Sequence, residues 1–184
     1  MSMKKGRIVI ITGSPGTGKS TTALMIARGA NVSKSVYMHT DDFYHYIQKG
    51  AIPPFLPEAQ EQNLMVIEAF LEAAKRFARG GYDVMIDGIV GPWFLKPWLK
   101  VVQDHYEVHY IILRASKEET MKRAMHRTKL DVETNIDLVE KMWEQFKNLG
   151  VYEANVIDTT NQSVEQSVST IKAVIKEKSS LLTV

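Results

Sequence analysis

The chain contains no cysteine among its 184 residues. Disulfide bonds, thiolate catalysis and cysteine-based zinc sites are therefore excluded. The formal net charge is only +2, which is too small to predict binding to nucleic acid or to an anionic membrane. No apolar stretch approaches the length of a membrane-spanning helix. An apolar run does follow Lys4, Lys5 and Arg7, but it ends at Ile11 and does not predict a signal peptide. We therefore expect a cytoplasmic protein.

The composition is that of an ordinary globular protein, with 45% hydrophobic and 24% charged residues. The length suits one domain with a substantial core, so we expect residues 1–184 to form a single domain. Strand-like and helix-like segments alternate along it, which predicts an α/β fold with a parallel sheet covered by helices on both faces. The five expected strands are Arg7–Thr12, Ser35–Thr40, Asp83–Ile86, Glu107–Leu113 and Asn155–Ile157.

Capping signals mark several of the intervening helices. Gly80-Gly81 is expected to end a helix whose apolar stripe begins at Leu64. Ser116 with Glu119 has the pattern of a capping box that opens a helix running through Arg127. Ser163 with Gln166 has the same pattern and predicts a final helix.

One glycine-rich segment carries most of the functional information. It fits G-x-x-x-x-G-K-[ST], follows the apolar run Ile8–Ile11 and precedes a helix-forming stretch from Thr21. Glycines let backbone N–H groups approach phosphate oxygens, and the helix start at Thr21 adds unpaired amides and partial positive charge. An ordinary glycine-rich turn is the alternative, but the strand before and the helix after favour binding of a nucleoside triphosphate. The residues concerned are Gly13, Ser14, Pro15, Gly16, Thr17, Gly18, Lys19, Ser20 and Thr21.

Two acidic groups follow predicted strands. Val84-Met85-Ile86-Asp87 has the form of a Walker B strand, and we expect Asp87 to hold Mg²⁺ together with the Ser20 hydroxyl. Asp41-Asp42 follows another strand, where an aspartate can accept a proton from an attacking hydroxyl. A helix N-cap or Asx-turn is an equally good interpretation of Asp42.

Gly88 follows Asp87, where ATPases of the AAA and helicase types usually place a glutamate that activates water. The D-x-x-G and N-K-x-D motifs of guanine-nucleotide switches are also absent from the sequence. The pattern therefore favours transfer of phosphate to an alcohol over hydrolysis.

Arg123 and Arg127 are i, i+4 neighbours on a predicted helix and could stabilise charge on the transferred phosphoryl group. The alternative is a pair of solvated charges, with Glu119 as an ion-pair partner. Two irregular segments, residues 43–57 and 88–97, follow strand ends, where open α/β sheets bind ligands. They are the expected walls of an acceptor pocket, although their aromatic residues could equally belong to the core. The aromatics concerned are Phe43, Phe55 and Trp93, together with Trp98 directly after the second segment.

With these motifs, nearly the whole chain resembles the small P-loop kinases, which include nucleoside monophosphate, shikimate and gluconate kinases, chloramphenicol phosphotransferase and zeta-toxin-type enzymes. The resemblance implies a three-layer P-loop NTPase fold with a five-stranded parallel sheet of order 2-3-1-4-5. It also implies a short lid at about residues 127–136, an acceptor-binding segment at about residues 43–80, and adenine near Thr160, Asn161 and Gln162. His39-Thr40-Asp41-Asp42-Phe43-Tyr44 is similar to a motif of uridine and nicotinamide riboside kinases whose first aspartate is the base, which singles out Asp41.

The chain departs from nucleoside monophosphate kinases because residues 43–63 and 88–92 contain no arginine to bind an acceptor phosphate. We therefore expect a neutral or weakly acidic hydroxyl compound, such as a nucleoside or an antibiotic-like alcohol, with a sugar acid possible through His45 or Lys49. The expected acceptor-binding residues are Asp42, Tyr44, His45 and Trp93.

The predicted function is an ATP- and Mg²⁺-dependent kinase acting on a small molecule, with Lys19, Asp41, Arg123 and Arg127 in catalytic roles. A nucleoside, nucleotide or gluconate-type sugar-acid kinase is the alternative within the family. An ATP-sensing regulatory module without phosphotransfer is the alternative from another class. Neither nucleic acid nor membrane is an expected partner, and the protein is expected to be a monomer or a homodimer.

Overall fold

A five-stranded, all-parallel sheet forms the centre of the computed structural model, which describes residues 5–125 and 132–184. The strand order is β2-β3-β1-β4-β5, so the predicted fold class and strand order are confirmed. Each predicted strand is present within one residue of its expected bounds. The strands are β1 (Ile8–Thr12), β2 (Ser35–His39), β3 (Asp83–Asp87), β4 (Val108–Arg114) and β5 (Val156–Asp158).

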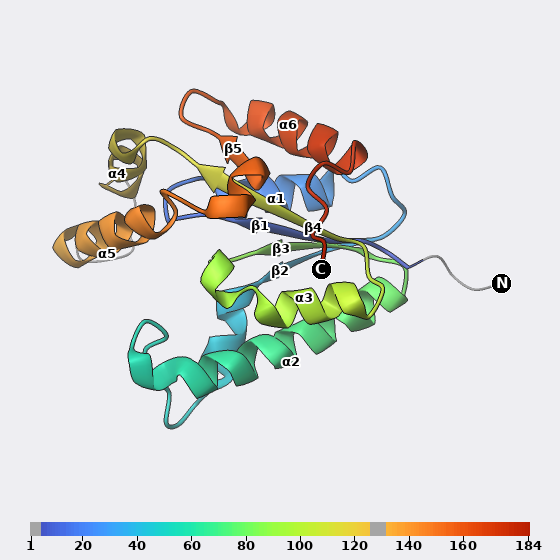
Figure 1. Cartoon of the computed structure of the whole chain (residues 1–184), viewed down its shortest axis with the longest axis horizontal. Coiled ribbons are helices and arrows are strands. Elements are labelled where there is room, and N and C mark those ends of the chain that lie inside the picture. Colours follow the sequence, from blue (N-terminus) through green and yellow to red (C-terminus); the bar gives the residue numbers. More distant parts are fainter. Residues whose placement is uncertain (1–4, 126–131) are drawn as a thin grey trace.

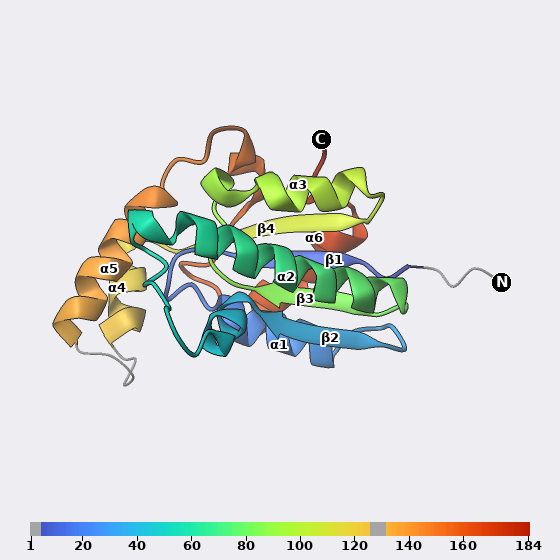
Figure 2. The same ribbon diagram turned by 90° about the horizontal axis from the view of Figure 1, so that it is seen from below.

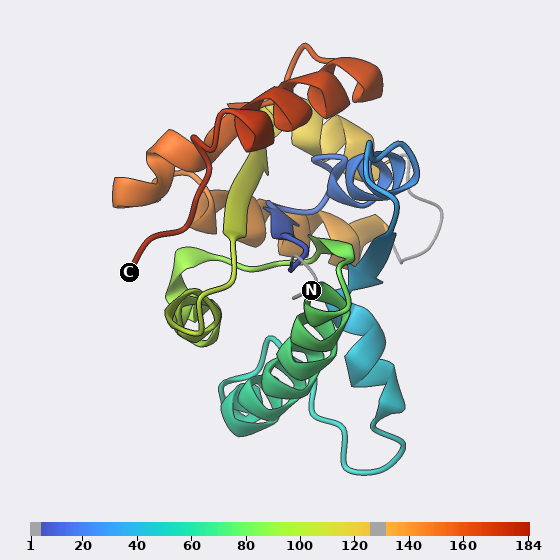
Figure 3. The ribbon, with the colours of Figure 1, turned by 90° about the vertical axis from the view of Figure 1, so that its right-hand side faces the viewer.

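Helices cover both faces of the sheet (Figure 1). α1 (Lys19–Arg28) and α6 (Val164–Lys176) lie on one face, and α2 (Gln60–Arg79) and α3 (Lys96–Gln103) lie on the other. The end-on view in Figure 3 separates these layers, and Figure 2 shows α2 and α3 running across the sheet. α4 (Lys117–Met125) and α5 (Val132–Gln145) lie together beyond the carboxyl ends of the strands. In the described ranges, no helix is both long and apolar enough to cross a bilayer.

Short 3-10 helices complete the connections: η1 (Thr40–Tyr46), η2 (Pro57–Ala59), η3 (Pro92–Phe94) and η4 (Gly150–Asn155). Two of them follow strands whose ends carry predicted site residues. η1 directly continues β2, and η3 lies in the connection after β3. Both segments predicted to be irregular therefore begin at the carboxyl edge of the sheet.

Burial of both faces of the sheet explains why the strand sequences are unbroken apolar runs. In β1, Ile8 and Ile10 pack toward α2 and α3, while Val9 and Ile11 pack toward α1 and α6. All four side chains are fully buried. A parallel strand covered on both faces has no solvent-facing positions, so its sequence does not alternate between polar and apolar residues.

Helix capping matches the sequence patterns in part. The Ser163–Gln166 capping box is complete, with hydrogen bonds in both directions. At α4, Ser116 Oγ accepts from the backbone N–H of Glu119, but Ser116 N–H donates to Thr160 Oγ1 instead of to the glutamate. The Glu119 carboxylate binds Arg123. α4 is described as far as Met125, so Arg127 lies outside the described residues.

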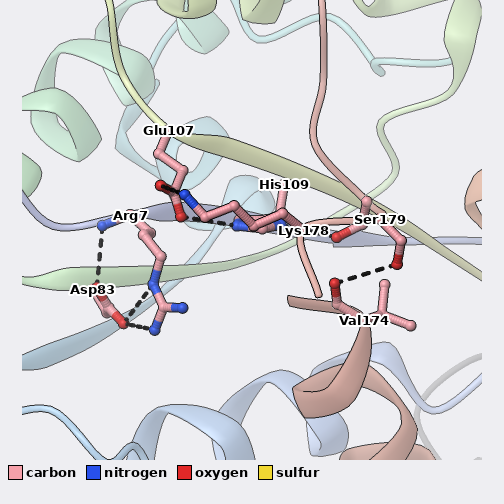
Figure 4. Close-up of polar contacts among 8 residues, drawn as sticks. Arg7, Asp83, Glu107, His109, Val174, Lys178 and Ser179 are labelled. Carbon is pink, nitrogen blue, oxygen red and sulfur yellow. Dashed lines mark hydrogen bonds and ion pairs between the residues drawn. The ribbon is translucent and has the colours of Figure 1, made fainter. Parts of the chain in front are cut away.

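Polar contacts hold the opposite, amino-terminal edge of the sheet (Figure 4). Arg7 pairs with buried Asp83, and Glu107 contacts both His109 and Lys178. Behind them the chain after α6 runs along β4: Tyr110 N–H donates to the Ser180 carbonyl and Leu182 N–H donates to Val108. These contacts lie at the far end of the sheet from the predicted site.

Candidate nucleotide and acceptor site

The glycine-rich loop has the backbone that its sequence predicts. Gly16 and Gly18 both adopt φ of +87°, and Gly18 immediately precedes α1. Gly13 has φ of +145°, and a Cβ there would lie 2.1 Å from the Leu113 carbonyl oxygen. Glycine is required because side chains rarely adopt these angles and because β4 approaches the loop closely.

Polar side chains inside this loop are buried. Thr17 Oγ1 donates to the Ser14 carbonyl at 2.9 Å, and the ammonium group of Lys19 lies 3.5 Å from the same oxygen. Lys19 is 6% exposed. Within the described ranges, Ser14 Oγ is buried and has no hydrogen-bond partner. An unsatisfied buried hydroxyl is costly, and a phosphate oxygen is a partner that would satisfy it.

Asp87 ends β3 beside this loop and is fully buried. Its Oδ2 accepts a hydrogen bond from the Tyr37 hydroxyl at 2.9 Å and lies 2.9 Å from Nδ1 of His39. Burial acts to raise the pKa of Asp87, but hydrogen bonds from His39 and Ser20 and the charge of Lys19 bring the pKa below its usual value. The carboxylate therefore stays ionised in the interior, in the neighbourhood of Ser20 and Lys19.

The other oxygen of this carboxylate, Oδ1, is buried and accepts no hydrogen bond from the described residues. The chemistry fits a Mg²⁺ site of the P-loop kind, in which protein supplies few ligands and phosphates and water supply the rest. No cluster of three or more His, Asp or Glu side chains suited to a metal occurs in the described part of the chain. An all-protein metal cage is therefore not what these residues form.

Asp41 lies just past the end of β2 and is half exposed, with 57% of its side chain accessible. Its Oδ2 lies 3.4 Å from Nε2 of His39, and Thr40 Oγ1 donates to its Oδ1 at 3.3 Å. The contact with His39 lowers the pKa of Asp41, and the charge of Lys19 lowers it further against the effect of burial. Asp41 is thus an ionised, accessible carboxylate whose pKa is influenced by Lys19.

His39 links these two carboxylates and was not among the functional residues that the sequence predicts. It pairs in register with Asp87 across β2 and β3, which places its ring between Asp87 and Asp41. Hydrogen bonds to Asp41 and Asp87 raise the pKa of His39 to about 10. Tyr37, two residues earlier on β2, is the other missed partner of Asp87, and burial together with the charge of Asp87 raises its pKa. The period-2 spacing of Tyr37, His39 and Asp41 is the signal that could have identified both residues.

The connection after β3 is anchored at Val90. Val90 N–H donates to Thr12 Oγ1 at 2.8 Å, and the Tyr110 hydroxyl donates to the Val90 carbonyl at 2.6 Å. Beyond this anchor, Trp93 is 55% exposed and its ring packs edge-on against Phe146. The segment is thus fixed to the sheet and presents an indole at the same edge as Asp87.

The predicted acceptor-binding residues occupy different positions. Tyr44 is half buried three residues after Asp41 in η1, and burial and the charge of Asp41 raise its pKa. Asp42 and His45 are exposed on η1. Trp98, expected as a possible pocket wall, is fully buried in the core with Phe70, so that expectation is wrong.

Arg123 contacts the connection after β5. It pairs with Glu119 at 2.7 Å, as the alternative interpretation of the sequence predicts, and donates to the Thr159 carbonyl at 3.1 Å. This places the guanidinium beside the segment expected to contact adenine. Asn161 is exposed there and lines a shallow polar cavity of about 490 Å³ near the start of α6.

Comparisons with known proteins agree with this geometry. A family model described as AAA domain matches residues 9–163. No curated protein sequence matches the chain significantly. The solved structures with the same architecture include the tunicamycin resistance protein of Deinococcus radiodurans, at 20% identity and a TM-score of 0.64 over 93% of this chain and 96% of that protein.

Two kinases are also similar. A gluconokinase from Sinorhizobium meliloti is 18% identical, with a TM-score of 0.65 over 96% of this chain and 95% of that protein. The APS kinase of Mycobacterium tuberculosis, solved with AMPPNP and APS, is 17% identical, with a TM-score of 0.69 over 94% of this chain and 98% of that protein. At these identities the likeness shows a shared fold.

Proposed function

This chain belongs to the AAA domain family, and on that premise we propose that it is an ATP- and Mg²⁺-dependent kinase that transfers the γ-phosphate of ATP to a hydroxyl group of a small molecule. The observation that carries the proposal is the position of Asp41. Its accessible carboxylate lies near the buried ammonium group of Lys19, and the charge of Lys19 lowers its pKa. A passive nucleotide binder has no need of an accessible carboxylate at that place.

In the proposed reaction, the backbone of Gly13–Ser20 and the ammonium group of Lys19 bind the β- and γ-phosphates. The acceptor hydroxyl donates a hydrogen bond to Asp41 and attacks the γ-phosphorus. The new bond joins the acceptor oxygen to phosphorus, the bond from phosphorus to the β,γ-bridging oxygen breaks, and ADP leaves with the bond electrons. The hydroxyl proton passes to Asp41 and then to solvent. Because the transition state is loose, the lowered pKa of Asp41 suits a group that orients the hydroxyl.

Ser20 and Asp87 are the proposed protein ligands of Mg²⁺, with Oδ1 of Asp87 as the carboxylate atom left without a hydrogen bond. A bound Mg²⁺ would neutralise charge on the phosphate oxygens. Arg123 is proposed to contact the nucleotide beside Thr159, and Arg127 is proposed to stabilise the transferred phosphoryl group. Gly88 after Asp87 supports transfer to an alcohol, because no carboxylate follows to activate water.

The proposed acceptor is a neutral or weakly acidic hydroxyl compound. Residues 43–63 and 88–92 lack the arginines that would bind an acceptor phosphate. The first of these segments exposes aromatic surface at Tyr46 and Phe55, and Trp93 is exposed directly after the second. A nucleoside or an antibiotic-like alcohol suits these surroundings better than a phosphorylated compound. A sugar acid would need His45 or Lys49 to face it.

The test is ATP consumption by the purified protein with Mg²⁺ against a panel of nucleosides, sugar acids and hydroxylated antibiotics. We expect at least one acceptor to stimulate ADP formation and to gain a phosphate detectable by mass spectrometry. Binding of Mg·ATP with no acceptor-stimulated turnover across the panel would support the ATP-sensing alternative. Absence of any heat with Mg·ATP in calorimetry would contradict both functions.

A further inference from the structure

The imidazole of His39 contacts a carboxylate with each of its two nitrogens. Nδ1 lies 2.9 Å from Oδ2 of Asp87, and Nε2 lies 3.4 Å from Oδ2 of Asp41. The two carboxylates belong to different parts of the proposed reaction, because one is assigned to Mg²⁺ and the other to the acceptor hydroxyl. A single ring therefore connects the cation side of the site to the acceptor side.

The two carboxylate oxygens of Asp87 differ in their contacts. Tyr37 and His39 both bind Oδ2, whereas Oδ1 is buried and accepts no hydrogen bond from the described residues. Groups that hold one oxygen of a ligating carboxylate fix the direction of the other, and their loss typically lowers metal affinity by about 10- to 100-fold. The geometry selects Oδ1 as the atom available to a cation.

At Asp41, His39 has a different effect. The side chain of Asp41 is half exposed on the first turn of η1, and its other hydrogen-bonding contact is with the adjacent Thr40. A side chain this accessible has several rotamers open to it, and a reacting group must be held to within a fraction of an ångström. The position of His39 is itself fixed by Asp87, since the two residues are paired in register on neighbouring strands. It can therefore transmit the rigidity of the sheet to Asp41.

We propose that His39 is a positioning residue that fixes Asp87 for the cation and Asp41 for the acceptor hydroxyl at the same time. The role of His39 at Asp41 rests on the proposed kinase function. Its role at Asp87 concerns Mg²⁺-dependent binding of ATP alone. Loss of the imidazole should therefore impair both the Mg²⁺-dependent binding of ATP and the turnover of the acceptor. Separate variants can test these two effects.

Two substitutions of His39 test the contacts of its Nδ1 and Nε2 atoms separately. In His39→Asn the side-chain amide N–H group takes the place of Nδ1, so the contact with Asp87 is kept and that with Asp41 is lost. In His39→Gln the longer side chain brings its amide to the place of Nε2, so the contact with Asp41 is kept and that with Asp87 is lost. Tyr37→Phe serves as the matched variant at Asp87, because it removes one hydrogen bond to Oδ2 without touching Asp41.

The first measurement is the ratio of the Kd of ATP in EDTA to the Kd of ATP in Mg²⁺, by calorimetry. We expect this ratio to fall by about 10-fold in His39→Gln, to fall in Tyr37→Phe, and to stay near that of the unchanged protein in His39→Asn. Equal ratios in all four proteins would overturn the proposal, whether or not an acceptor is known. Thermal unfolding of each variant identifies any that fails to fold.

The second measurement uses an acceptor that is phosphorylated in the panel described above. We expect His39→Asn to lower kcat by about 10-fold with little change in the KM for ATP, and His39→Gln to recover part of that kcat at saturating Mg²⁺. Equal kcat in His39→Asn and the unchanged protein would overturn the proposal that His39 positions Asp41. If no compound is phosphorylated by the unchanged protein, the kinase proposal fails, and the magnesium ratio alone decides the role of His39.

Discussion

Gly88 packs directly against Thr40: a Cβ at position 88 would lie 2.0 Å from Thr40 Oγ1 and 2.8 Å from Thr40 Cβ. These residues follow Asp87 on β3 and His39 on β2, respectively, so the contact sets the separation of the two strand ends. The glycine after the aspartate is therefore a spacing requirement of the site, in addition to the absence of a water-activating acid. It lets the ends of β2 and β3 approach each other, so that His39 on β2 contacts Asp87 on β3.

The substitution Gly88→Ala should destabilise the fold by about 1–3 kcal/mol, because the added methyl group overlaps with Thr40. Urea unfolding measures the change in free energy. Thr40→Ala removes Oγ1 and the methyl group of Thr40, so the double variant should lose less stability than the sum of the two single variants. Strict additivity would show that the two side chains do not compete for the same space.

The substitution Asp41→Asn should lower acceptor-dependent turnover by about 10²-fold, because the neutral amide cannot accept the hydroxyl proton. The Kd of Mg·ATP, measured by calorimetry, should remain nearly unchanged. Asp104→Asn is the matched control, since this carboxylate is exposed at the end of α3 and has no role in the proposed reaction. Equal effects of the two substitutions would remove Asp41 from the mechanism.

The substitution Lys19→Met should lower turnover by at least about 10²-fold, because it removes the ammonium group that is proposed to bind the β- and γ-phosphates. The folded state should persist, as judged by circular dichroism. Lys176→Met on the exposed side of α6 removes the same charge far from the site and should leave turnover unchanged. Full kinase activity of the Lys19 variant would contradict the assigned role.

The contribution of His109 to stability should fall as the pH decreases through the range in which an unfolded imidazole titrates. Burial lowers the pKa of His109 in the folded protein, partly opposed by Glu107, while the charges of Arg7 and Lys178 lower it further. In the unfolded chain the imidazole titrates near 6.5. Below that pH the unfolded state binds a proton that the folded state lacks, so the free energy of unfolding decreases as pH falls, by at most about 1.4 kcal/mol per pH unit.

Urea unfolding between pH 7.5 and 5.5 measures this dependence. His109→Gln should flatten the curve relative to the unchanged protein, because the titrating group is gone. His105→Asn is the control, since His105 is exposed and its positive φ is one that asparagine tolerates. Parallel curves for the unchanged protein and His109→Gln would contradict the assignment.

Much of this architecture follows from local sequence. The strands were predictable because apolar β-branched runs buried on both faces leave an unbroken signal, as in Ile8–Ile11. The proximity of Ser20 and Asp87 was predictable because the end of one parallel strand and the start of the helix after its neighbour meet at one sheet edge. The order of the strands came from the family resemblance, because spacing along a chain does not determine which strands are adjacent.

The sequence was less informative about side-chain direction. Trp93 and Trp98 are five residues apart, yet the first is 55% exposed and the second is fully buried. Only the helical spacing of Leu95, Trp98 and Val101 distinguishes them, because it places Trp98 on the buried face of α3. The link from His39 to Asp87 required both the period of β2 and its adjacency to β3. Either fact alone leaves the histidine as an ordinary strand residue.

The anchoring of Val90 to Thr12 and Tyr110 has a consequence for how this protein could change its substrate. The connection beyond that anchor, and the stretch from Tyr46 to Phe55, carry exposed side chains, whereas Lys19, Asp87 and His39 are held by the sheet and α1. Changes in these outer connections should therefore alter the accepted compound while leaving the residues proposed to bind the nucleotide unchanged. A library randomised only at Tyr46, Phe55 and Trp93 is a rational starting point for redirecting specificity.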